Sequence, residues 1–174
     1  YGINIHFSHK DLIPMPIGIA NDYSPKNLLI KDFLHHEPVT NKKTMLYINN
    51  RKNTNHKERD YIYNSFYNTD WCKLDEPVLT NEEYKENLDN HLFILCPEGN
   101  GVDTHRIWES LYLGSIPVVK NHITHSTLND LNILKVNNFH EINFELLKKF
   151  KEELNYKDNK KLQIDYWMDL ISNG

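Results

Sequence analysis

The chain of 174 residues lacks several features that would assign it to common protein classes. Its two cysteines, Cys72 and Cys96, are too few for the disulfide framework of a small secreted domain. No apolar run approaches the roughly 20 residues of a membrane-spanning helix, so we expect no membrane span in this chain. The 10 histidines are not accompanied by cysteines or carboxylates at metal-ligand spacing, so we expect no metal site and no cofactor.

Other absences bear on partners and location. The net charge is −4 and no broad basic stripe is present, which argues against a nucleic acid as the main partner. The pattern Gly-x4-Gly-Lys-Ser/Thr is missing, which disfavours a phosphotransferase or nucleotide hydrolase. The sequence contains no Asn-x-Ser/Thr sequon, and this favours a cytoplasmic location.

The residues that are present suit one globular core, since 39% of them are hydrophobic. From Thr44 onward, short apolar runs alternate with helical patterns, which predicts an α/β fold with a parallel sheet and right-handed crossovers. The expected strands are 44–49, 71–74, 91–96, 116–119 and 133–136. The expected helices are 56–68, 80–88, 103–113, 144–154 and 158–172.

Three local signals mark where helices begin and end. Thr80 and Glu83 form the pattern of a capping box, and Asn143 is placed to cap the helix that follows it. Gly114 is expected to end a helix in the left-handed conformation, which glycine adopts without strain.

The most informative stretch is 93–119, which has the pattern of a buried strand, a glycine-containing turn, a capped helix and a second strand. Gly99 and Gly101 allow a tight turn and a close approach to a ligand, while Asp103 or Thr104 can cap the helix. The start of a helix favours an anion such as phosphate, and ligands of parallel sheets bind beyond the carboxyl ends of the strands. An ordinary crossover with glycines that serve packing alone explains the same spacing.

The helix in this stretch carries Arg106 and Glu109 on one face, because they are three residues apart. An arginine near phosphates and a carboxylate that accepts bonds from ribose hydroxyls would suit a nucleotide sugar. A simple ion pair, worth about 0.3 kcal/mol, would also explain the two residues.

Residues 97–119 have the pattern Pro-x-Gly-x-Gly-x-Asp-Thr-x-Arg-x-x-Glu-x-Leu-x-x-Gly-x-Ile-Pro-Val-Val. This pattern resembles the donor-binding signature of exostosin-like glycosyltransferases and, more broadly, the C-terminal nucleotide-sugar domain of the GT-B fold. The segments 13–21 and 45–51, together with Arg59, extend the resemblance over residues 13–120. Glu98 departs from it, because exostosins often carry a basic residue there.

The resemblance implies a Rossmann-like nucleotide-sugar-binding domain at 39–174. Residues 1–38, which are punctuated by prolines, would be an interdomain segment or the tail of an N-terminal domain. The implied function is an inverting glycosyltransferase that moves a sugar from a UDP- or GDP-type donor to a glycan hydroxyl. Its general base would come from the other domain. A non-catalytic nucleotide- or sugar-binding module derived from such an enzyme is the alternative.

The resemblance also assigns roles to residues. The segment 99–104 would cradle the diphosphate, Arg51 and Arg106 would offset its charge, and Glu109 would bind the ribose. Arg51 is the candidate for stabilising the leaving group, and no catalytic base is assigned. The expected substrate-binding residues are Asn50, Arg51, Pro97, Gly99, Asn100, Gly101, Asp103, Thr104, Arg106 and Glu109.

Several of these residues have simpler interpretations. Arg51 lies in a loop that also suits an ordinary polar surface, and Arg59 can either reach the phosphates or form a surface ion pair. The Asp103 carboxylate is expected to act as a cap that stays ionised and weakly basic, rather than as a general base. His105 and His122 are placed near the expected ligand edge of the sheet, where each could contact the ligand or face solvent.

Overall fold

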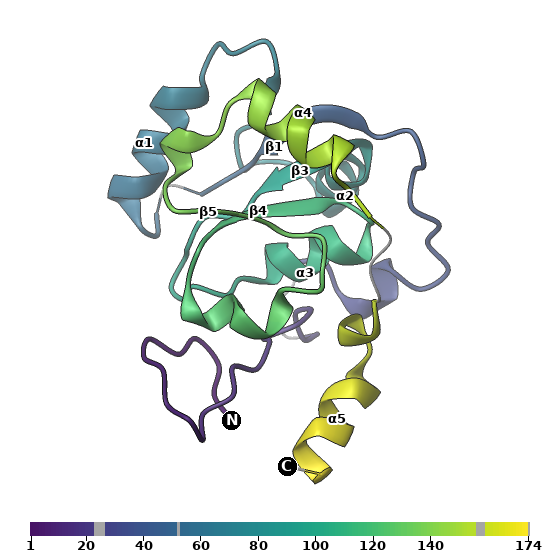
Figure 1. Cartoon of the computed structure of the whole chain (residues 1–174). Coiled ribbons are helices and arrows are strands. Elements are labelled where there is room, and N and C mark those ends of the chain that lie inside the picture. The colour runs from purple at the N-terminus through teal and green to yellow at the C-terminus, as the bar shows by residue number, and fades with distance from the viewer. Residues whose placement is uncertain (23–26, 52, 156–158, 174) are drawn as a thin grey trace.

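The computed structural model describes residues 1–22, 27–51, 53–155 and 159–173. Its centre is a five-stranded sheet with the order β2-β1-β3-β4-β5, in which every neighbouring pair is parallel (Figure 1). The predicted α/β class, with a Rossmann-like parallel sheet, is therefore confirmed. The strands are β1 (Lys43–Ile48), β2 (Cys72–Leu74), β3 (His91–Leu95), β4 (Ile116–Lys120) and β5 (Leu134–Val136).

Helices cover both faces of this sheet, with α1 and α4 on one side and α3 on the other (Figure 1). Successive residues of a strand point to opposite faces, so Phe93 and Ile94 belong to two different apolar clusters. The cluster around Phe93 includes Ile62 of α1, and the cluster around Ile94 includes Trp108 of α3. The helices are α1 (His56–Phe66), α2 (Asn81–Asn90), α3 (His105–Tyr112), α4 (Phe144–Glu152) and α5 (Ile164–Asn173). Short 3₁₀ helices lie at Ile30–Asp32, Ile123–Leu128, Phe139–Glu141 and Lys160–Leu162.

Two predicted helix starts are confirmed in atomic detail. The Thr80 hydroxyl accepts a hydrogen bond from the Glu83 amide, and the Glu83 carboxylate accepts one from the Thr80 amide, at 3.2 and 2.8 Å. At the start of α4, the side-chain oxygen of Asn143 accepts from the Leu146 amide at 2.9 Å. Both patterns could be recognised because the partners lie three residues apart in the chain.

The last predicted helix, 158–172, starts later than expected, and residue 158 lies outside the described residues. A 3₁₀ turn at Lys160–Leu162 is followed by an extended Gln163, and α5 begins only at Ile164. The carbonyls of Lys161 and Leu162 accept hydrogen bonds from the side chains of Trp167 and Tyr112. Because these carbonyls bind side chains, a continuous helix does not form there.

The end of α3 has the predicted glycine geometry. Gly114 has a φ of +68°, its amide donates to the Leu111 carbonyl, and the Ser115 amide donates to the Ser110 carbonyl. These two bonds form a Schellman motif, which ends the helix and returns the chain into β4. A Cβ at position 114 would lie 3.1 Å from the Cβ of Pro38.

We expect Gly114→Ala to lower the free energy of unfolding by about 1–2 kcal/mol, because a Cβ disfavours the left-handed conformation. Gly114→Asn should lose about half as much, since asparagine tolerates this conformation and has the same Cβ contact with Pro38. Urea denaturation of the three proteins measures the difference. Equal stability of the glycine and alanine forms would contradict the strain argument.

Residues 1–22 pack along α3, α5 and the 3₁₀ helix Ile123–Leu128. The Thr124 hydroxyl donates to the Ile5 carbonyl and the Tyr1 hydroxyl donates to the Leu170 carbonyl, both at 2.7 Å. Met15, Ile17 and Ile19 pack against the cluster that contains Trp108. The division of the chain at residue 38 stays a prediction. In the described part of the chain, no helix has both the length and the apolar character needed to cross a membrane.

Candidate functional site

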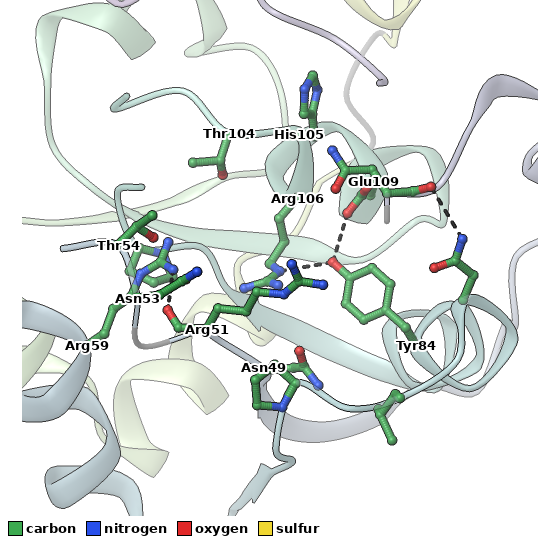
Figure 2. Close-up of a pocket in the computed structure, with 15 residues that line it drawn as sticks. Asn49, Arg51, Asn53, Thr54, Arg59, Tyr84, Thr104, His105, Arg106 and Glu109 are labelled. Carbon is green, nitrogen blue, oxygen red and sulfur yellow. Dashed lines mark hydrogen bonds between the residues drawn. The ribbon is translucent and has the colours of Figure 1, made fainter. Parts of the chain in front are cut away.

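A cavity of about 340 Å³ opens at the carboxyl edge of the sheet (Figure 2). Its walls come from the loop after β1, from α1, from the segment that leads into α2, and from the start of α3. β1 and β3 are parallel neighbours, with Tyr47 paired to Ile94, so the segments that follow them emerge at the same edge. The lining residues are Asn27, Asn49, Arg51, Asn53, Thr54, Arg59, Pro77, Leu79, Asn81, Tyr84, Pro97, Thr104, His105, Arg106 and Glu109.

A chain of hydrogen bonds through Tyr84 connects Arg106 to Glu109. The Arg106 Nε donates to the Tyr84 hydroxyl at 2.9 Å, and that hydroxyl donates to Glu109 Oε2 at 2.8 Å (Figure 2). Arg106 Nη1 also donates to the side-chain oxygen of Asn50. The other carboxylate oxygen of Glu109 accepts from the Leu28 amide at 3.3 Å. Arg106 and Glu109 thus belong to one hydrogen-bond network. They are linked through the Tyr84 hydroxyl and do not form the direct ion pair considered above.

Burial determines how this network is protonated. It raises the pKa of Tyr84 well above the ordinary value, so the phenol keeps its proton and can donate to Glu109. Burial also raises the pKa of Glu109, while the hydrogen bond from Tyr84 and the charge of Arg106 oppose that shift. Glu109 is 3% exposed.

Three arginines line the cavity, and none of them forms an ion pair with a carboxylate of the described residues. Arg59 instead donates to the backbone carbonyls of Arg51 and Glu98, at 2.6 and 3.0 Å. Burial and the nearby charge of Arg106 lower the pKa of Arg59. Within the described ranges, Arg59 Nε and Thr104 Oγ1 are buried atoms without a hydrogen-bond partner. The cavity lining therefore carries three arginines and one glutamate, together with two buried polar atoms that have no partner among the described residues.

The structure brings five of the ten predicted substrate-binding residues to this cavity and leaves the other five outside its lining. Asn50 is outside but contacts Arg106 directly. The main difference from the expectation is that the glycine-containing loop lies outside the cavity lining. The lining includes Arg51, Pro97, Thr104, Arg106 and Glu109, and it does not include Asn50, Gly99, Asn100, Gly101 and Asp103.

Two amides of this loop already have acceptors within the protein. The Asp103 amide donates to the Asn4 side chain at 2.7 Å, and the Gly99 amide donates to the Gly101 carbonyl at 2.9 Å. A Cβ on Gly101 would lie 2.7 Å from the same Asn4 side chain. Gly101 therefore permits the close approach of Asn4, and binding of a diphosphate by this loop stays a prediction that the geometry does not support.

The predicted role of the Asp103 carboxylate as a helix cap is wrong. This carboxylate accepts from the Ile17 amide at 2.8 Å and from Trp108 Nε1 at 2.9 Å. Thr104 holds the N-cap position of α3, and its side chain makes no capping hydrogen bond. Burial raises the pKa of Asp103 to about 6, although these hydrogen bonds oppose the shift. The carboxylate is therefore more basic than expected, because the expectation omitted the loss of water around the group.

The sequence predicts both His105 and His122 near this edge, and the structure places only His105 at the cavity. His105 lines the cavity, and its Nδ1 lies 2.8 Å from the Gly18 carbonyl. His122 lies outside the lining, where its Nδ1 accepts from the Thr124 amide and its ring meets that of His6 edge to face. Among the residues that the structure describes, no group of three or more His, Cys, Asp or Glu side chains could hold a metal ion.

Tyr84 is a site residue that no pattern in the sequence predicts. Tyr84 lies in the first turn of α2, whose capping box predicted the helix without indicating which way its side chains point. Pro77 and Leu79 precede the same helix, and Asn27 comes from the segment expected to link two domains. The strand order, which places α2 next to α3, identifies Pro77, Leu79 and Tyr84 as part of the site, and the packing of the N-terminal segment adds Asn27.

Comparison with known proteins gives one family. No curated protein matches the chain. Residues 41–165 match the family model described as the RXYLT1 C-terminal domain, so the match includes β1 to β5, α1 to α4 and the start of α5. This is more than half of the chain and covers most of the cavity. The chain therefore belongs to the RXYLT1 C-terminal domain family, an exostosin-like family related to glycosyltransferases.

Proposed function

We propose that this domain binds the nucleoside diphosphate part of a sugar donor in the cavity described above. The observation that carries the proposal is the set of three cavity arginines without carboxylate ion pairs in the described residues, facing a buried glutamate. Arginines present planar sets of donors that suit phosphate oxygens. A cavity with this charge at the carboxyl edge of a parallel sheet fits a phosphate-bearing ligand.

The positions of the charged groups indicate how such a ligand would lie. Arg59 and Thr104 lie toward one end of the cavity, Glu109 and Tyr84 lie toward the other, and the side chains of Arg51 and Arg106 extend between them (Figure 2). We call the end with Arg59 the arginine end. The diphosphate would occupy the arginine end, where the unpartnered Thr104 hydroxyl and the start of α3 also favour an anion.

Glu109 would then accept hydrogen bonds from the ribose hydroxyls. Each of its carboxylate oxygens already accepts one hydrogen bond, from Leu28 and from Tyr84. A carboxylate has about four lone-pair sites, so two remain for a ligand. The protein donors fix the orientation of the carboxylate before the ligand arrives, which reduces the entropy lost on binding.

We further propose that the domain serves an inverting transfer within a GT-B arrangement. The acceptor hydroxyl oxygen would attack the anomeric carbon, and the bond from that carbon to the diphosphate oxygen would break. The nucleoside diphosphate would leave with the bonding electron pair, stabilised by Arg51 and Arg106. A general base, which we do not assign to this chain, would take the hydroxyl proton. The acceptor would be a glycan hydroxyl.

Titration calorimetry with UDP, GDP and inorganic pyrophosphate tests the binding proposal. We expect a nucleoside diphosphate to bind with a dissociation constant of roughly 1 µM–1 mM, the range typical of enzyme substrates. The affinity should fall as salt is added, because exposed charges are screened. A folded protein that gives no binding signal with any of the three ligands would refute the proposal.

The release of free nucleotide separates an enzyme from a binding module. Sugar donors are incubated with the protein and a glycan acceptor, and free UDP or GDP is measured. Release that depends on the acceptor supports the transferase. Binding without release, in the protein with its full set of domains, indicates the non-catalytic module instead.

A further inference from the structure

An ion cluster adjoins the arginine end of the cavity without lining it. Lys120, the last residue of β4, lies with its Nζ 2.6 Å from Glu58 Oε1 and 3.1 Å from Glu98 Oε1. The three side chains are 26%, 17% and 30% exposed, so water screens them only partly. We call this set the Lys120 cluster. It joins α1, the loop after β3 and the end of β4.

The two acidic members of the cluster are adjacent to groups that form the cavity. Glu58 precedes Arg59 on α1, and Glu98 provides the carbonyl that accepts from Arg59 Nη2 at 3.0 Å. The Lys120 cluster thus holds both the helix that carries Arg59 and one of the two carbonyls that orient its guanidinium. The second carbonyl belongs to Arg51.

The charges of the cluster also matter for an anion. Glu58 and Glu98 place two carboxylates beside a cavity that we propose for a diphosphate, and their charges would repel it. Lys120 compensates part of this negative charge. Burial lowers the pKa of Lys120, but the two glutamates outweigh burial and raise it, so the lysine stays charged at neutral pH.

We propose that Lys120 is a positioning residue for anion binding, acting through Glu58 and Glu98 to hold Arg59 toward the diphosphate end of the cavity. The inference rests on the proposed function, because it assumes that Arg59 contacts the anion. Lys120 itself is not part of the cavity lining. Its effect must therefore pass through Arg59 and the local charge.

The test measures pyrophosphate affinity by calorimetry in the full chain. Lys120→Met should weaken binding about tenfold, which corresponds to about 1.4 kcal/mol. Lys120→Arg keeps the charge and the reach, and should stay within about threefold of the original protein. The matched control is Lys149→Met, because Lys149 also pairs with a glutamate but is 72% exposed on α4. That control should change the affinity less than about twofold.

A double-mutant comparison separates positioning from a general loss of structure. In an Arg59→Met background, Lys120→Met should weaken pyrophosphate binding by only about threefold, because the group that it positions is already gone and only the loss of local charge compensation remains. The inference is overturned if the double variant loses affinity by the product of the two single-variant factors. It is also overturned if Lys120→Met alone binds pyrophosphate as well as the original protein, or if Lys120→Arg binds it as weakly as Lys120→Met. Lys120→Gln provides a second neutral variant if the methionine form does not fold.

These outcomes are distinct from failure of the proposed function. If the unaltered chain binds neither pyrophosphate nor a nucleoside diphosphate, the anion site itself is wrong, and the role of Lys120 falls with it. If the unaltered chain binds pyrophosphate and Lys120→Met binds it equally well, only the inference about Lys120 fails.

Discussion

Replacing Arg106 with methionine is expected to weaken the binding of pyrophosphate and of nucleoside diphosphates by roughly 100-fold, the largest effect of any single change in the cavity. Arg106 lies between the two ends of the cavity, and Tyr84 and Asn50 hold its guanidinium in place. A hydrogen bond to a charged group contributes about 1.5–3 kcal/mol, and loss of one or two such bonds accounts for the expected factor. Methionine keeps most of the length and the apolar stem of the side chain.

Arg106→Lys and Lys148→Met are the controls for this prediction. Arg106→Lys keeps a positive charge but cannot reproduce both the Tyr84 and the Asn50 contacts, so an intermediate loss is expected. Lys148→Met removes one positive charge from an exposed position on α4 and should leave the affinity unchanged. Circular dichroism checks that each variant is folded. A folded Arg106→Met that binds pyrophosphate as well as the original chain would remove Arg106 from the site.

Glu109→Ala is expected to act on stability and on binding together. The substitution leaves the Leu28 amide and the Tyr84 hydroxyl without their acceptor in a buried place, and it opens a small cavity. Each buried group left unsatisfied costs about 1–3 kcal/mol, so the free energy of unfolding should fall by about 3 kcal/mol. Chemical denaturation measures this loss.

The binding part of the Glu109 prediction depends on which ligand is titrated. A nucleoside diphosphate should lose at least ~1 kcal/mol of binding free energy, because the proposed bonds to ribose disappear. Pyrophosphate has no ribose and should lose little. Glu109→Gln keeps the shape and one acceptor oxygen, so we expect smaller losses of both stability and binding. Equal losses for the two ligands would contradict a contact between Glu109 and the ribose.

The sequence was informative about the fold wherever the determining contacts are local. The short apolar runs at 44–49, 91–96 and 116–119 predicted strands within two residues of those observed. The capping box at Thr80 and the glycine after α3 were confirmed, because their partners lie within a few residues. The start of α5 was missed because it depends on Tyr112, a residue about 50 positions away that bonds the Leu162 carbonyl.

The candidate site also has parts that the sequence predicts and parts that it does not. Arg51 follows β1, while Arg106 and Glu109 lie on the helix that follows β3. Parallel neighbours end at one edge, so their meeting in one cavity could be anticipated, although their roles in binding stay predictions. The partners of the glycine loop could not be anticipated. Asn4 and Ile17 bind it from 99 and 86 residues away, and nothing in a local pattern specifies such a partner.

Side chains at and beside the cavity are held by backbone groups from an early, distant part of the chain. The Leu28 amide orients Glu109, the Ile17 amide holds Asp103, and the Gly18 carbonyl contacts His105. The orientation of these side chains therefore depends on more of the chain than the segment around α3. Anyone who grafts the segment around α3 onto a related scaffold would also have to transplant residues 17–18 and 28, since the acidic side chains take their orientation from that early stretch.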